Sequence, residues 1–258
     1  MSDPLSIQSS NKDVPAVFGE NTQGGDGLFG HGAGAGRGVV GVSDTHTGVE
    51  GNSASGDGLF GTGQSGRGVV GVAQSGSGVE GNSTSGAGVF GSSQTGAGVF
   101  GRGSPAGHFE GDVVVTGDVQ LAGGDVAEHF AVTDAFGVEA GSVMVLAGPD
   151  QVRVSSQPYD RRVAGVVSGA GGYRPGVVLD HHGEHNGSQP LALVGKAFCK
   201  VDASYGPVEC GDLLTTSPTA GHAMIAADSG RAFGAILGKA MAPLAHGTGL
   251  VPVLIALT

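Results

Sequence analysis

Histidines and acids gather in one short stretch of the chain, residues 179–187, which reads Leu-Asp-His-His-Gly-Glu-His-Asn-Gly. Neutral imidazoles and carboxylates together can bind zinc or nickel, so the candidate metal ligands are His181, His182 and His185. The two glycines of the stretch make it flexible, which does not favour a preformed site. We therefore predict a solvated loop here, with no metal and no other cofactor.

Acidic residues elsewhere could take part in acid–base chemistry. Asp125 and Glu128 are three residues apart, which would place both carboxylates on one face if residues 125–130 form a short helix. Capping of that helix by Asp125 is the simpler interpretation. Asp160 precedes two arginines and is predicted to end a strand in an ion pair. Because no nucleophile and base can be matched by spacing, we predict no catalytic residues and no enzymatic activity.

The two cysteines, Cys199 and Cys210, flank a turn at residues 202–207. A hairpin around this turn would place them opposite each other. We nevertheless expect two buried, free thiols, because cross-strand disulfides are strained and the sequence shows no export leader.

The dinucleotide-binding pattern Gly-x-Gly-x-x-Gly occurs seven times between residues 25 and 101. Each copy arises from an internal repeat, and none opens a helix after a strand, as a phosphate-binding loop requires. The net charge of −11 also disfavours a phosphate backbone as a partner. We predict neither a nucleotide site nor nucleic-acid binding.

Glycine repeats dominate the first half of the chain. There are 53 glycines in 258 residues and no tryptophan, and the glycine that opens each unit recurs every ten residues from 38 to 98. Each unit reads glycine, aliphatic residue, variable residue, glycine and a polar turn. Because side chains alternate along a strand, the aliphatic residue is predicted to face a core. These predicted core residues are Leu28, Val39, Val49, Leu59, Val69, Val79, Val89 and Val99.

A longer period of 30 residues lies over the period of ten. Gly-Val-Glu-Gly-Asn-Ser occurs at 48–53 and again at 78–83. Three strands per repeat predict a triangular coil, either a single-chain β-solenoid or a β-prism of three intertwined chains. One chain would complete fewer than three coils, about 13 Å tall with both ends open, whereas three chains pair almost every strand with a neighbour. We favour the intertwined trimer and keep the solenoid as the alternative.

Ordinary strand patterns replace the repeat in the second half. Alternating or apolar runs occur at 112–116, 118–121, 141–146, 151–154, 162–167, 191–194, 196–201 and 250–256. The predicted fold class is therefore all-β, a triangular β-prism or β-helix shaft followed by a compact β-barrel or sandwich. The predicted parts are an N-terminal arm (1–24), the repeat shaft (25–111), connector strands (112–124) and a C-terminal β domain (125–258).

Three motifs of the second half carry a resemblance. The motifs are Gly-Asp-Val-Ala-Glu-His-Phe at 124–130, Gly-Ser-Val-Met-Val-Leu at 141–146 and the run from Tyr159 to Ser168. All three resemble the C-terminal domain family of phage tail spikes and neck appendages. In that family the domain acts as an intramolecular chaperone for trimer assembly and in some members cuts itself free. No cleavage nucleophile of that family matches a position here, so the resemblance implies assembly alone.

A structural role follows as the leading hypothesis: a homotrimeric fibre or spike whose C-terminal domain directs assembly. The alternatives are an adhesin module that binds a cell-surface glycan or a tail or baseplate protein, and a self-cleaving assembly domain. No leader and no apolar stretch of membrane-spanning length is found, so we expect cytoplasmic synthesis without membrane insertion, within a phage or phage-like particle or with release by a leaderless route.

Overall fold

The computed structural model describes the whole chain except residues 1–4, 12, 135, 181–186 and 258. The chain divides into two compact units, Met1–Gly107 and His108–Thr258. All the strands and helices of the described residues lie in the second unit, between Asp125 and Ala256.

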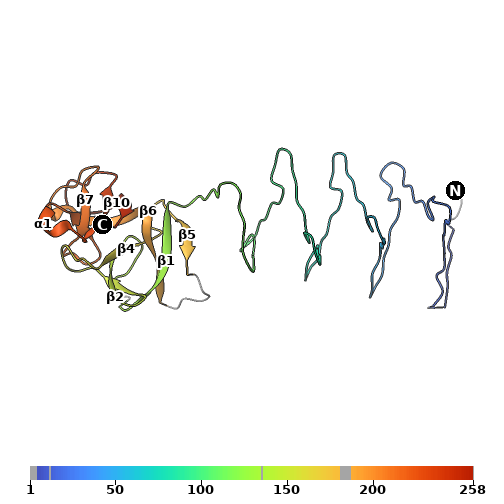
Figure 1. Ribbon diagram of the computed structural model, residues 1–258, viewed down its shortest axis with the longest axis horizontal. Coiled ribbons are helices and arrows are strands. Elements are labelled where there is room, and N and C mark those ends of the chain that lie inside the picture. The colour runs from blue at the N-terminus through green and yellow to red at the C-terminus, as the bar shows by residue number, and fades with distance from the viewer. Residues whose placement is uncertain (1–4, 12, 135, 181–186, 258) are drawn as a thin grey trace. The chain divides into compact units, whose positions relative to one another are not determined.

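The first unit is an extended chain that reverses direction repeatedly (Figure 1). Each reversal brings two glycines together at the ends of a polar loop. A Cβ atom on Gly71 would lie 2.1 Å from the carbonyl oxygen of Gly78 and 2.5 Å from a methyl carbon of Val79. The same arrangement joins Gly41 to Gly48 and Gly91 to Gly98. The repeat glycines thus permit a close backbone approach that no side chain would allow.

Serines close several of these loops. The hydroxyl oxygen of Ser53 accepts a hydrogen bond of 2.9 Å from the Gly56 amide, and Ser83 makes the same bond to Gly86. Thirty residues separate the two bonds, as they separate the hydrogen bonds from Asn52 to Glu50 and from Asn82 to Glu80. The 30-residue period of the sequence is therefore also a period of local structure.

We expect Gly71→Ala to disrupt the first unit far more than Gly66→Ala. The alanine Cβ at position 71 would overlap the Gly78 backbone, which cannot rotate away as a side chain can, whereas a Cβ on Gly66 meets no atom within 4 Å. Limited proteolysis of the full chain checks this prediction, with faster cleavage within residues 66–80 expected for Gly71→Ala alone. Equal cleavage of the two variants would contradict it.

The described residues of the second unit form ten strands. They are β1 (Asp125–Val132), β2 (Val143–Gly148), β3 (Gln151–Val154), β4 (Val163–Val167), β5 (Pro175–Leu179), β6 (Ser188–Asp202), β7 (Leu213–Thr216), β8 (Ala223–Ile225), β9 (Ile236–Ala240) and β10 (Thr248–Ala256). The 3₁₀ turn η1 (Ala203–Tyr205) and the helix α1 (Ser229–Ala232) complete the elements. Both helices are far too short to cross a bilayer, and the described residues contain no membrane-spanning helix.

The strands close into two rings that share β6. The sheet order is β10-β9-β7-β8-β6-β4-β2-β3-β1-β5, and two further pairings join β10 to β6 and β6 to β1. One ring therefore runs β6-β10-β9-β7-β8 and the other β6-β4-β2-β3-β1. Closure removes free edges from both rings, and β5 is the strand that lies outside them, paired with β1.

Side-chain alternation on β6 and β10 builds the core of the first ring. In their antiparallel register Cys199 lies opposite Val251 and Ala197 opposite Val253, and all four side chains are buried. Leu250 and Leu254, which flank the two valines of β10, are exposed. Apolar residues on every second position of two paired strands thus face one interior, together with Leu214 and Leu237.

A smaller apolar cluster belongs to the second ring. Met144, Val152 and Leu191 are fully buried there, on β2, β3 and β6. β6 thus contributes buried side chains to both clusters, which its 15 residues make possible.

The second unit confirms the predicted all-β fold, and its closed rings fit the expected barrel. The predicted strands at 141–146, 151–154, 162–167 and 250–256 correspond to β2, β3, β4 and β10, and the two predicted strands at 191–194 and 196–201 are one strand, β6. The predicted helix at 125–130 is wrong, because these residues form β1, held by β5 on one side and β6 on the other.

The expected strands of the shaft and of the connector are not formed by the single chain. Residues 5–107 and 108–124, where described, contain no strand. A strand requires hydrogen-bonded pairing with a second segment about 4.8 Å away, and the described residues of the first unit form no such pairing. Neither the single-chain solenoid nor the three-chain prism is confirmed, and both stay predictions.

Candidate functional site

All eight side chains of the predicted trimer core are exposed in the single chain. The eight side chains range from 57% exposed at Val49 to 77% at Leu28. The neighbouring variable position is also exposed, as at Phe29 and Val40. One chain therefore provides no core for either position, and any such core would need further chains.

Asp125 is a buried carboxyl group of the second unit with an unusual environment. Asp125, the first residue of β1, is only 4% exposed. Its Oδ2 accepts a hydrogen bond of 2.7 Å from the Ser168 hydroxyl, while Oδ1 has no hydrogen-bond partner among the described residues. Burial raises the pKa of the Asp125 carboxyl above its ordinary value, and the bond from Ser168 opposes the rise.

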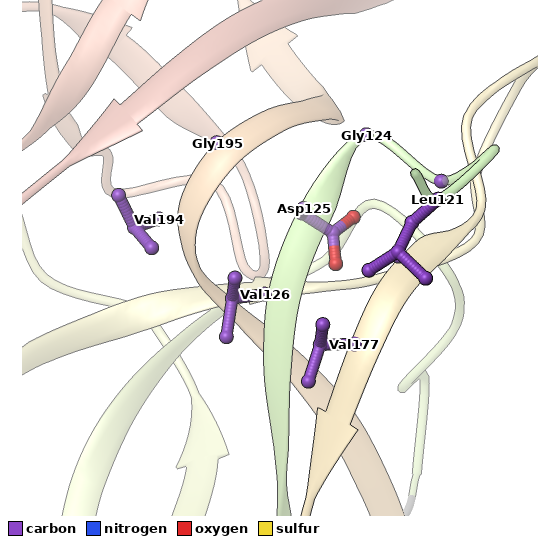
Figure 2. A pocket seen from close by; sticks show the side chains of 9 residues that line it. Leu121, Gly124, Asp125, Val126, Val177, Val194 and Gly195 are labelled. Carbon is purple, nitrogen blue, oxygen red and sulfur yellow. The ribbon is translucent and has the colours of Figure 1, made fainter. Parts of the chain in front are cut away.

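A shallow, largely apolar hollow of about 210 Å³ lies beside Asp125. It is lined by Leu121, Gly123, Gly124, Asp125, Val126, Gly176, Val177, Val194 and Gly195. Figure 2 shows the Asp125 carboxyl group projecting from β1 towards Leu121, with Val177 on β5 next to it. The glycines bring the backbones together, since a Cβ on Gly123 would lie 2.1 Å from the Gly176 nitrogen. The hollow thus marks where the connector meets the starts of β1 and β5.

The pKa shift of Asp125 predicts how stability changes with pH. The folded state holds the proton more tightly than the unfolded state, so the contribution of this group to stability is largest below the unfolded pKa of about 3.9 and falls as the pH rises through the folded pKa. We therefore expect Asp125→Asn, which is neutral at every pH, to raise the melting temperature at pH 7 by a few degrees and to have little effect near pH 3.5.

Thermal melts of the full chain at the two pH values test this expectation. Asp118→Asn, a change at an exposed acid of the connector, is the matched control and should leave the melting temperature unchanged. A loss of stability in Asp125→Asn that is equal at both pH values would mean that the charge of Asp125 does not matter.

The predicted pair of Asp125 and Glu128 is not assembled. On a strand, residues three apart are not brought together as they are on a helical turn. Asp125 instead bonds to Ser168, which lies at the end of β4, 43 residues away. Sequence analysis did not single out Ser168 as a partner of Asp125, because no short spacing connects the two residues.

Asp160 forms the predicted ion pair with Arg162. The Nη2 atom of Arg162 lies 2.7 Å from Oδ2 of Asp160, and its Nε donates to Oδ1 at 2.9 Å. The Arg162 guanidinium lowers the pKa of the Asp160 carboxyl. The pair directly precedes β4, so the prediction that it ends a strand is wrong and the pair lies instead where a strand begins.

The expectation of two free, buried cysteine thiols is confirmed for Cys199 and only in part for Cys210. Both thiols are free, and Cys199 is fully buried, but Cys210 is exposed. Burial raises the pKa of the Cys199 thiol to about 12, so this thiol is not a nucleophile at neutral pH. The predicted hairpin pairing of the two is wrong, because β10 occupies the position opposite Cys199, where Val251 lies.

The candidate metal ligands His181, His182 and His185 lie outside the described residues. In the part of the chain that the structure describes, no group of three histidines, cysteines or acids could hold a metal ion.

The three tyrosines do not form a shared aromatic platform. Tyr159 lies under the Arg231 guanidinium at 4.4 Å, and its hydroxyl accepts a hydrogen bond from the Asp228 amide. Tyr173 packs against Phe198 with ring centroids 5.1 Å apart, and Tyr205 bonds to Thr219. Each ring therefore has its own neighbours within the second unit.

Comparison with known proteins adds little to this picture. No protein-family model and no curated protein matches the chain. Among solved structures, a chain of "The capsid of Myoviridae Phage XM1" is similar at 15% identity and a TM-score of 0.33, over 58% of this chain and 99% of that one. A likeness of that size carries no conclusion about fold or function, so the function has to be argued from the chain itself.

Proposed function

We propose that this protein is a structural fibre or spike subunit that assembles as a homotrimer through its glycine repeats. The observation that carries the proposal is the exposure of an aliphatic side chain in every repeat, on a period of ten residues. Soluble proteins rarely expose apolar residues in so regular an array without a partner for them. Burial of these valines and leucines against other chains would be favourable, because it removes apolar surface from water.

Backbone hydrogen bonding supports the same proposal. The described residues of the repeat form no strand pairing. Within each loop only a local contact is present, the close approach of the two glycines at its ends. Three chains winding about one axis would give each extended segment a neighbour in another chain and leave almost no free edge. In this assembly the second unit, a closed all-β domain, directs the register of the chains, and the role is not enzymatic.

The biological setting belongs to the proposal as well. The motifs at 124–130, 141–146 and 159–168 resemble phage spike domains that assist trimer assembly, which supports a place in a phage or phage-like particle. A receptor-binding tip would need an exposed aromatic platform, and the separate contacts of the tyrosines do not favour one. We therefore restrict the proposal to assembly.

Sedimentation equilibrium of the full chain tests the proposal. The expected mass is three times that of the 25.1 kDa chain, and denaturing mass spectrometry should give the intact chain mass alone. A single-chain mass at micromolar concentration would overturn the trimer, and a shorter product would point to self-cleavage instead.

A further inference from the structure

We propose that residues 112–116 of one copy add a strand to the free edge of β5 in a neighbouring copy. The inference rests on the proposed trimer and specifies how the second units would be connected within it. Each copy would donate one strand and accept one, a head-to-tail exchange that closes after three copies.

The acceptor is the strand that both rings leave out. β5 pairs with β1 in parallel and with no other described strand, while the other nine strands belong to closed rings. Its side chains become more exposed along its length, reaching 37% at Val178 and 48% at Leu179. An unpaired strand edge presents backbone donors and acceptors that a further strand can satisfy.

The donor is a segment with a strand sequence and no strand partner. Residues 112–116 read Asp-Val-Val-Val-Thr, a β-branched run that favours a strand, yet they form none in the single chain. Val113, Val114 and Val115 are all more than half exposed. Three adjacent valines in water are unfavourable, whereas pairing with β5 would satisfy one backbone edge of the segment and place its valines beside the side chains of β5.

The apolar hollow at the start of β5 suits such a strand. Leu121, Val177 and Val194 line it, and Gly176 lies there against the backbone of Gly123. The chain's own residues 121–124 already occupy one side, where the Gly124 amide donates a hydrogen bond to the Arg174 carbonyl. A valine from residues 112–116 of another copy would fill the remaining space.

Continuity with the repeats favours a second copy over the same chain as the donor. Residues 112–116 directly follow the repeat shaft at Gly111. If three shafts wind together, the proposal requires three such segments to lie close to one another. Each donor is then held near the acceptors of its neighbours at a high effective concentration.

Disulfide trapping in the full chain tests the exchange. The acceptor carries Val178→Cys, and each variant adds one donor cysteine, Val113→Cys, Val114→Cys or Val115→Cys. All variants also carry Cys210→Ser, which leaves only the buried Cys199 as a further thiol. We expect at least one pair to give chains linked to each other under mild oxidation, about tenfold above control. Paired strands bring facing Cβ atoms to about 4.5–5.5 Å, close enough for a strained disulfide to trap the pairing. The controls are each single-cysteine variant and the same donors combined with Leu254→Cys, an exposed position on β10 within a closed ring.

Each outcome of the trapping experiment has a distinct meaning. Links within one chain would assign the donor strand to the same chain and overturn the exchange. No link at any of the three positions, with a trimeric mass retained, would overturn the exchange and leave the trimer. A single-chain mass would remove both proposals. Amide exchange of the unmodified chain gives an independent check, with slowed exchange expected in residues 112–116 and 176–179 together, and fast exchange in both contradicting the pairing.

Discussion

Val69→Asp is expected to abolish assembly of the chain. In the proposed prism Val69 occupies the aliphatic position that faces the shared axis, so three carboxylates would meet there without cationic partners. Each buried, unpaired charge costs several kcal/mol, and three of them should weaken association more than about a thousandfold. The same change in an isolated chain should have little effect, because Val69 is 74% exposed there.

Val70→Asp is the matched control, since it places the same side chain one residue further along. Side chains alternate along a strand, so position 70 would point away from the axis. Glu50 and Glu80 already occupy the corresponding position of other repeats, which indicates that an acid is tolerated there. Sedimentation equilibrium should give a trimer for Val70→Asp and a single chain for Val69→Asp. If both variants assemble equally well, the aliphatic position does not form the core.

Leu214→Ala is expected to have the largest effect on the stability of the second unit. Leu214 is fully buried on β7, within the apolar cluster that fills the ring of β6, β7, β8, β9 and β10. Removing most of its side chain loses the free energy of burial and leaves a cavity, which together destabilise by about 2–5 kcal/mol. For a domain of ordinary stability this loss amounts to a large fraction of the free energy of unfolding.

Leu213→Ala provides the comparison on the same strand. Leu213 directly precedes Leu214 but is 42% exposed, so its truncation should cost less than about 1 kcal/mol. Urea denaturation, followed by a spectroscopic signal of the β domain, measures both free energies of unfolding. Similar values for the two variants would mean that the ring interior is not a packed core.

Strands of the C-terminal domain could be predicted where apolar and polar residues alternate strongly along the sequence. They could not be predicted where the strand forms only because a segment distant in the sequence pairs with it. Residues 250–256 alternate clearly, and β10 follows them. The segment at 125–130 combines alanine, glutamate and an aspartate suited to a cap, a composition compatible with a helix, and only its pairing with β5 and β6 makes it a strand. β5 escaped detection because its residues 175–179 begin with proline and glycine, which usually mark turns.

In the candidate site, too, contacts between neighbours in the sequence could be predicted and contacts between distant residues could not. The ion pair of Asp160 and Arg162 follows from residues two apart, and the structure contains it. The partner of Asp125 is Ser168, which shares no local pattern with it and reaches it because β1 and β4 both pair with β6. Cys210 is exposed because it lies in a turn before β7 and not on a strand that pairs with β6.

The sequence by itself determined the local features of this protein: the ten- and thirty-residue periods, the polar turns and the positions of alternating strands. These depend on backbone preferences and side-chain direction, which act over a few residues. Only the tertiary structure decided that β6 serves two rings, that β5 remains outside them and that Asp125 is buried beside Ser168. Such features arise from pairings between distant segments, whose free energy depends on what the rest of the chain places opposite each strand.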